Sequence, residues 1–189
     1  MKISAGVAKG RRTATKKLLS KASNREHLRP TSSKVREALF DILRDSIREA
    51  VFVDLYAGTG TVGLEALSRG AKKAIFVEQN SLRSRTIHEI VRKLGFEGQA
   101  EVIRGKACDL VVKRAAEQAD ICFVDPPYKS NEIDTLLPLI GETGFLRKQG
   151  IVIVEHFFKR KVPEKAGKVI MSRSYRYGDT MLTIYRKVT

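Results

Sequence analysis

The sequence predicts an α/β protein with an open, mostly parallel sheet and a C-terminal antiparallel hairpin. Two observations carry this prediction. Short apolar runs alternate with helical stretches from residue 51 onward, and the last two apolar runs flank Tyr177-Gly178-Asp179. Repeated strand–helix–strand units form parallel sheets covered by helices on both faces, whereas a short turn between two runs favours an antiparallel pair.

Seven strands are expected, and most are short and apolar, as strands buried on both faces are. They are Val51–Leu55, Ala74–Val77, Ala100–Arg104, Ile121–Val124, Ile151–Val154, Val169–Tyr175 and Thr180–Lys187. The helices expected between them are Thr61–Arg69, Ser81–Leu94, Asp109–Gln118 and Asn131–Gly141, the last interrupted near Pro138. Ahead of these, Ser32 and Ser33 signal the start of a helix that reaches about residue 50, with an apolar stripe at Val35, Leu39, Leu43 and Ile47.

Length and composition exclude several classes. A chain of 189 residues with 42% hydrophobic residues can bury a core and is not disordered. No apolar run approaches the roughly 20 residues of a membrane span, so we expect no integral membrane protein, and the basic N-terminus lacks the apolar run typical of a secretory signal. The two cysteines, Cys108 and Cys122, have no metal-ligand spacing, so we expect no metal and a reducing cytoplasmic location.

The positive charge is concentrated at the two ends. Residues 1–36 hold eleven Lys or Arg and one acid, and residues 159–189 hold nine against two, while the total is +15. Basic ends favour a polyanion such as nucleic acid, because each neutralised phosphate releases counterions; a solubilising surface is the alternative. We expect a basic arm or hairpin over residues 1–30, followed by one domain over 31–189. The candidate nucleic-acid contacts are Lys2, Lys9, Arg11, Arg12, Lys16, Lys17, Arg29 and Arg36.

A glycine-rich loop follows the first expected strand, and an acid follows the second. The loop is Asp54-Leu55-Tyr56-Ala57-Gly58-Thr59-Gly60, and Gly63 completes the spacing of a dinucleotide fingerprint. Such loops bind ligands at the carboxyl ends of parallel strands. Glu78, twenty residues after Gly58, can accept both hydroxyls of a ribose. The pattern therefore predicts a ribosyl cofactor, and it fits NAD as well as S-adenosylmethionine.

A rigid turn, Asp125-Pro126-Pro127-Tyr128, follows the strand Ile121–Val124. Two prolines fix φ and remove two backbone donors. The Asp125 carboxylate and the Pro126 carbonyl can each accept one N–H of a planar amine, while the Tyr128 ring stacks on the base. The turn thus favours an exocyclic amine as the reacting group.

These motifs resemble the class I S-adenosylmethionine-dependent methyltransferases that act on exocyclic amino nitrogens. Further segments resemble the bacterial 16S ribosomal RNA guanine-N2 methyltransferase family, and the similarity extends over essentially the whole chain. They are Ile3-x-x-Gly6-x-x-x-Gly10-Arg11, Arg29-Pro30-Thr31, Val35-Arg36-Glu37-x-x-Phe40 and Gly63-Leu64-Glu65-Ala66-Leu67-Ser68-Arg69-Gly70.

The resemblance implies a Rossmann-like fold, S-adenosylmethionine on Asp54–Gly60 and Glu78, and catalysis at Asp125–Tyr128. It also implies methylation of guanine N2 in 16S ribosomal RNA of the small subunit, by a chain we expect to be a monomer. Lys106 stands where an acceptor for the adenine amine is common and cannot accept a hydrogen bond, so adenine recognition falls to Ala107–Cys108 or to Asp109. The alternatives are a DNA amino-methyltransferase, an NAD-dependent oxidoreductase and a non-enzymatic RNA-binding module.

Overall fold

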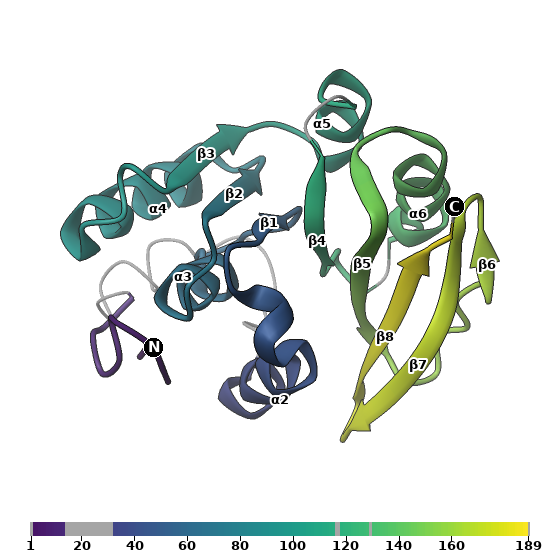
Figure 1. Cartoon of the computed structure of the whole chain (residues 1–189), viewed down its shortest axis with the longest axis horizontal. Helices are drawn as coiled ribbons and strands as arrows, with labels where there is room; N and C mark the ends of the chain where they lie inside the picture. Colours follow the sequence, from purple (N-terminus) through teal and green to yellow (C-terminus); the bar gives the residue numbers. More distant parts are fainter. Residues whose placement is uncertain (1, 14–31, 116–117, 129, 189) are drawn as a thin grey trace. The chain divides into compact units, whose positions relative to one another are not determined.

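The computed structural model describes residues 2–13, 32–115, 118–128 and 130–188. The chain divides into two compact units, residues 1–105 and 106–189, and Figure 1 traces both from the purple N-terminus to the yellow C-terminus. The predicted boundary between arm and domain at residue 30 lies outside the described residues and stays a prediction. None of the helices within the described ranges has the length and apolar character needed to cross a bilayer.

The first unit contains three parallel strands in the order β3-β2-β1. They are β1 (Val51–Asp54), β2 (Lys73–Glu78) and β3 (Ala100–Arg104). All but the first residue of β1 and of β2 are buried, which explains why the sequence shows continuous apolar runs there. Helix α3 (Thr61–Ser68) packs against β1 and β2, and α4 (Ser81–Leu94) packs against β2 and β3.

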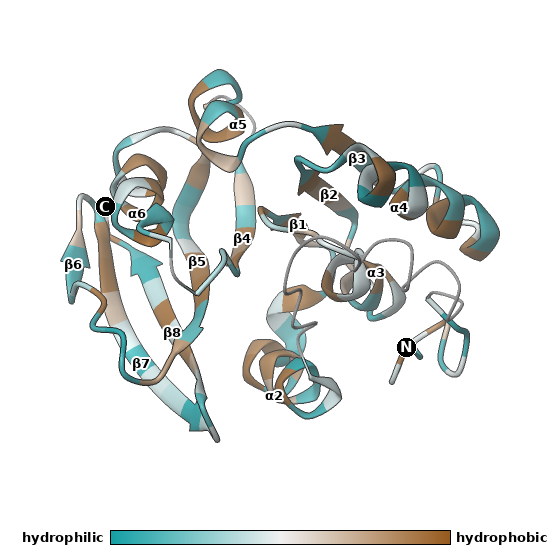
Figure 2. Cartoon of the chain, turned by 180° about the vertical axis from the view of Figure 1, so that it is seen from behind, coloured by the Kyte–Doolittle hydropathy of each residue, from teal (hydrophilic) through white to brown (hydrophobic). Residues whose placement is uncertain are grey.

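The ends of α4 follow the capping signals of the sequence. The Asn80 side chain accepts hydrogen bonds from the backbone N–H groups of Leu82 and Arg83, and Gly95 ends the helix in the left-handed region at φ 78°. Hydrophilic and hydrophobic bands alternate along α4 (Figure 2), as expected for a helix with one face on a sheet.

The helix predicted from residue 33 ends earlier than expected. Ser32 caps α2 (Ser33–Leu43) with its side chain, as predicted, and the apolar stripe is buried. Arg44 then adopts φ 44°, which no α-helix tolerates, and the chain continues as the 3₁₀ helix η1 (Arg44–Ile47). The apolar spacing persists through Ile47 and therefore conceals the break.

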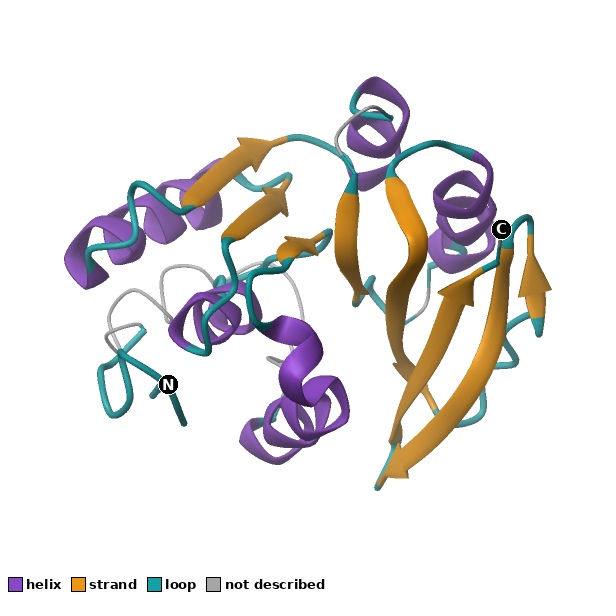
Figure 3. Cartoon of the chain, in the orientation of Figure 1, coloured by secondary structure: helices purple, strands orange, loops and turns teal. Residues whose placement is uncertain are grey.

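The second unit contains five strands in the order β4-β5-β8-β7-β6. Strands β4 (Ala119–Val124) and β5 (Leu146–Phe157) are parallel. Strand β8 (Thr180–Lys187) is antiparallel to both β5 and β7 (Val169–Tyr177), and Figure 3 shows β7 and β8 as a long ribbon. The predicted hairpin is confirmed. The short edge strand β6 (Lys165–Ala166) was not predicted, because two residues give no periodicity.

The two helices of this unit differ from prediction at their ends. Helix α5 spans Ala107–Lys113, so it starts two residues earlier and ends five earlier than expected. Helix α6 (Glu132–Glu142) continues through Pro138, where an interruption was predicted. Proline costs one backbone hydrogen bond, and α6 offsets that loss by burying Ile133, Leu136, Leu137 and Ile140.

Candidate functional site

The glycine loop and Glu78 lie at the same edge of the first unit's strands. Asp54 ends β1 and pairs with Phe76, two residues before Glu78 at the end of β2. Asp54 and Glu78 are both buried, with exposed fractions of 1% and 8%. Because β1 and β2 are parallel, their carboxyl ends place the loop after β1 beside the acid that ends β2.

A hydrogen bond joins the two predicted cofactor elements directly. The Gly58 N–H donates to Glu78 Oε2 at 2.9 Å, and the Asn80 N–H donates to Glu78 Oε1 at 2.8 Å. Arg83 Nη1 lies 3.8 Å from the same carboxylate and is also buried. The Ala57 N–H donates to the Val77 carbonyl at 2.9 Å. Glu78 therefore fixes the loop's shape, a role that the sequence did not reveal.

Gly58, Gly60 and Gly63, the three glycines of the fingerprint, have different structural roles. A Cβ on Gly63 would lie 2.3 Å from the Phe76 ring, so Gly63 permits α3 to pack on β2. Gly60 begins α3 at φ 74°, and a Cβ there would approach Ile87 to 3.1 Å. Gly58 has φ 54°, but the nearest atom to an added Cβ is 3.9 Å away. Packing within the protein thus explains Gly60 and Gly63, whereas at Gly58 the left-handed φ favours glycine and an added Cβ would meet no close contact.

These residues fit a ribosyl cofactor. An ionised carboxylate offers about four acceptor positions, and the backbone N–H groups of Gly58 and Asn80 use two of those on Glu78. The remaining acceptor capacity suits the two hydroxyls of a ribose, and the space at Gly58 permits close approach to the backbone. The other predicted loop residues, Tyr56, Ala57 and Thr59, belong to the same turn, and Ala57 is buried.

The predicted amine-binding turn lies in the second unit, directly after β4. Asp125 is partly exposed, Pro126 is buried and Pro127 is exposed. The Ser130 N–H donates to the Pro127 carbonyl at 2.8 Å and closes the turn. The hydroxyl groups of Tyr128 and Thr180 lie 3.2 Å apart, which ties this turn to the start of β8.

The residues proposed near the adenine begin α5. Ala107 is buried and Cys108 is partly exposed, and Lys106, at the N-cap position, makes no side-chain capping bond. The described contacts of Ala107 and Cys108 do not test whether they bind adenine, so their role in adenine recognition stays a prediction.

The N-terminal basic residues divide into three groups. Residues 2–13 form a hairpin-like loop, in which Lys2 and Arg12 make an antiparallel bridge and the Ile3 N–H donates to the Arg11 carbonyl at 3.0 Å. Lys2, Lys9, Arg11 and Arg12 are exposed, and Lys16, Lys17 and Arg29 lie outside the described residues. The prediction that Arg36 contacts RNA is corrected, because its side chain is only 2% exposed and is engaged inside the protein.

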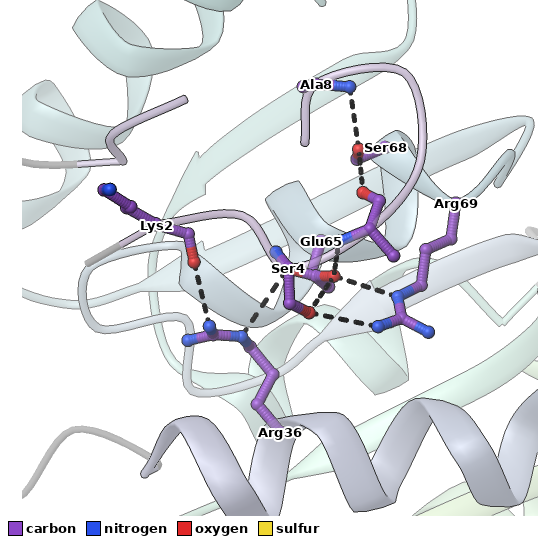
Figure 4. Close-up of polar contacts among 8 residues, drawn as sticks. Lys2, Ser4, Ala8, Arg36, Glu65, Ser68 and Arg69 are labelled. Carbon is purple, nitrogen blue, oxygen red and sulfur yellow. Dashed lines mark hydrogen bonds and ion pairs between the residues drawn. The ribbon is translucent and has the colours of Figure 1, made fainter. Parts of the chain in front are cut away.

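Arg36 belongs to a buried cluster that holds the N-terminal loop on α3 (Figure 4). At its centre Glu65, fully buried, accepts hydrogen bonds from Ser4 N at 2.9 Å, Ser4 Oγ at 2.6 Å and Ala5 N at 3.0 Å. Arg36 Nε lies 3.6 Å and Arg69 Nε 2.9 Å from the carboxylate. We call Ser4, Arg36, Glu65 and Arg69 the Glu65 cluster.

Two further features complete the attachment of the loop. Ser68 Oγ donates to the Ala5 carbonyl and accepts from the Ala8 N–H at 3.0 Å, and Gly6 adopts φ 80°. A Cβ on Gly6 would lie 1.7 Å from the Ser68 carbonyl oxygen, so only glycine fits. Sequence reasoning missed this cluster, although an acid such as Glu65 within the apolar run of α3 was a visible signal.

A hollow of about 610 Å³ lies elsewhere in the first unit. Gly6, Phe40, Arg44 and Arg69 are among the residues that line it, together with two aspartates. It includes none of the predicted cofactor or amine residues.

Comparison with solved structures defines the class of the fold. A chain described as "Putative methyltransferase yhhF from Escherichia coli" is similar over 100% of this chain and 98% of its own length, with a TM-score of 0.82 and 28% identity. A chain from Thermus thermophilus, described as a hypothetical protein, is similar over 97% of this chain and 98% of its own length, with a TM-score of 0.79 and 27% identity. This chain therefore has the Rossmann-like α/β fold of these solved structures, one of which is described as a putative methyltransferase, and the predicted fold class is confirmed.

Sequence comparison then gives the family. The model of the family described as "Conserved hypothetical protein 95" matches residues 1–186, and the chain belongs to this family. A relative from Bacillus subtilis, "Putative rRNA methyltransferase YlbH", is 34% identical over 99% of both chains. "Ribosomal RNA small subunit methyltransferase D" from Haemophilus influenzae is 33% identical over 82% of this chain and 78% of its own. The predicted resemblance to ribosomal RNA methyltransferases is therefore confirmed.

Proposed function

We propose that this protein transfers a methyl group from S-adenosylmethionine to the exocyclic N2 amine of a guanine in small-subunit ribosomal RNA. The observation that carries the choice of an amine is the turn Asp125–Tyr128 at the end of β4, with two prolines between an acid and an aromatic ring. Both named relatives support ribosomal RNA as the substrate, and the relative from Haemophilus influenzae supports the small subunit. The family resemblance supports guanine N2.

On this proposal, Gly58 and Glu78 bind the cofactor, which supplies a methyl group on a positively charged sulfur. The loop offers its backbone to the cofactor at Gly58, where no side chain intervenes. The Glu78 carboxylate accepts the ribose hydroxyls while it keeps its hydrogen bonds to Gly58 N and Asn80 N. The loop is held in this shape before the cofactor arrives, which lowers the ordering cost of binding.

The turn orients the amine. The target guanine leaves its stack, as substrates of base-modifying enzymes do. Asp125 and the Pro126 carbonyl each accept one N–H, so that the nitrogen lone pair faces the methyl carbon, and the Tyr128 ring stacks on the base. The N–C bond would form as the S–C bond breaks, with S-adenosylhomocysteine as the leaving group. The methylated nitrogen is acidic only then and would release its proton to water, so no strong base is required. Orientation of reactants can contribute about 7–11 kcal/mol to such a step.

The test is transfer of tritiated methyl groups to purified small-subunit particles and to free 16S RNA by wild type and by Asp125→Asn. We expect the variant to lose transfer while it keeps its affinity for S-adenosylmethionine, measured by calorimetry. Asp120→Asn is the matched control, because Asp120 lies near the start of the same strand in a partly exposed pair with Arg147 at 2.8 Å. Such pairs contribute little to stability, so Asp120→Asn should behave as wild type.

The alternatives give different results in the same preparations. A DNA amino-methyltransferase would label DNA in preference to RNA. An oxidoreductase would bind NAD with saturation and not S-adenosylmethionine. A non-enzymatic RNA-binding module would transfer no label and would be indifferent to Asp125→Asn.

A further inference from the structure

We propose that an aromatic and cationic surface at the closed end of the β7–β8 hairpin binds the single-stranded nucleotides next to the target guanine. We call Phe158, Lys159 and Arg176 the hairpin surface. The inference rests on the proposed function for the identity of the RNA, and it adds a second RNA contact that is separate from the N-terminal loop.

Two cationic side chains lie over the ring of Phe158. The Arg176 guanidinium carbon lies 3.9 Å and Lys159 Nζ 5.6 Å from the centre of this ring. Arg176 Nε also donates to the Gly178 carbonyl at 2.9 Å, and the Phe158 N–H donates to the Asp179 carbonyl at 2.9 Å. These bonds hold ring and guanidinium against the hairpin turn, so the surface is ordered before any ligand binds.

The hairpin surface is accessible to solvent and positively charged. Lys159 and Arg176 are exposed and Phe158 is partly exposed. Neither cation makes an ion pair with any residue that the structure describes. The segment from 159 to 189 carries nine basic residues against two acids. A partner with repeated negative charges therefore suits this surface, and RNA supplies them together with flat bases that stack on rings and guanidinium groups.

Aromatic rings connect the hairpin surface with the amine-binding turn. The rings of Tyr128 and Phe157 lie 6.2 Å apart, and those of Phe157 and Phe158 lie 4.8 Å apart in an edge-to-face arrangement. A row of three rings thus leads from Tyr128 to the hairpin surface. If Tyr128 contacts the extruded guanine, the nucleotides beside it in the RNA chain are those that reach Phe158 and Arg176.

Single-stranded RNA rather than duplex fits this geometry. Bases can stack on protein rings only where they are splayed out of a helix. A site that binds only phosphate would not require the Phe158 ring. An apolar surface of a partner protein would bury the charges of Lys159 and Arg176 without any opposite charge. The combination of ring and cations is what sequence-tolerant binding of single strands uses.

The experiment measures binding of a fluorescent single-stranded RNA oligonucleotide with one central guanine, over a range of salt concentrations. Arg176→Ala should weaken binding and reduce the salt slope by about 0.7, the value for one phosphate contact on a single strand. Phe158→Leu keeps an apolar side chain but removes the stacking face, and it should weaken binding about 5- to 150-fold, the range of base–aromatic stacking. Affinity for S-adenosylmethionine should not change in either variant.

The matched control is Arg186→Ala, which removes one exposed arginine near the other end of β8. It should bind RNA as wild type does. Wild-type affinity and salt slope in both Arg176→Ala and Phe158→Leu would overturn the proposal. A defect seen only with assembled particles, and not with free RNA, would also overturn it in favour of a protein contact. If Arg176→Ala weakens RNA binding as expected but the wild-type protein transfers no methyl group, the proposed function is refuted and the RNA-binding surface is not.

Discussion

Replacing Glu65 with alanine should destabilise the protein strongly, because it removes the centre of the Glu65 cluster. The carboxylate is fully buried, and the change would leave Arg36 at 2% exposure without its ion-pair partner. It would also deprive Ser4 N and Ala5 N of their acceptor. Breaking a buried ion pair from one side costs about 3–5 kcal/mol. The hydrogen bonds act on the same carboxylate, so their cost is part of this figure.

The assay is urea unfolding of wild type, Glu65→Ala and Glu65→Gln at neutral pH. We expect Glu65→Ala to lose about 3–5 kcal/mol of unfolding free energy and Glu65→Gln to lose less, because the amide retains one acceptor. Glu89→Ala is the control, since Glu89 is exposed on α4 and such changes stay within about 0.5 kcal/mol. Hydrogen exchange of Val7 and Ala8, whose N–H groups bond to Ser68, should accelerate in Glu65→Ala. A loss below about 1 kcal/mol, well under the cost of breaking a buried pair, would refute the assigned role.

Three further predictions concern the loop, pH and the thiols. Gly58→Ala should weaken binding of S-adenosylmethionine by at least tenfold in calorimetry, because its Cβ would enter the space that borders the loop; unchanged affinity would place the cofactor elsewhere. Burial lowers the pKa of His156, aided by Arg160 and opposed by the Phe157 carbonyl. The imidazole of His156 therefore binds a proton more readily in the unfolded chain than in the folded protein, and the free energy of unfolding should fall as pH drops below about 6.5. In urea titrations at several pH values, His156→Gln should lessen that fall, whereas His88→Gln should not. Cys108 is partly exposed and Cys122 fully buried, so a thiol reagent should modify one cysteine in the native protein and two after unfolding; two rapid reactions in native buffer would contradict the placement of Cys122.

The sequence predicted the elements whose signal is local. Apolar runs marked the strands, and Ser32 and Gly95 marked helix ends because capping depends on the residue at that position. The end of α2 was not predictable in this way. The positive φ of Arg44 leaves the apolar spacing intact, and only the fold shows that the helix stops there.

The sequence allowed us to predict which residues form the candidate site, but not which hydrogen bonds and ion pairs they make. The loop and Glu78 follow from spacing, yet the hydrogen bond between Gly58 and Glu78 depends on the register of β1 against β2. Arg36 was predicted to contact RNA because it belongs to the basic segment 1–36, but it is buried. Its partner, Glu65, is 29 residues away in the sequence, so this pairing becomes visible only in three dimensions.

The most direct test of the central claim is the identity of the methylated nucleoside. Small-subunit RNA modified by the wild-type protein with labelled S-adenosylmethionine would be digested completely and analysed by mass spectrometry against nucleoside standards. We expect the label in N2-methylguanosine. Label confined to methylated adenosine or cytidine, or to a methylated ribose, would contradict it.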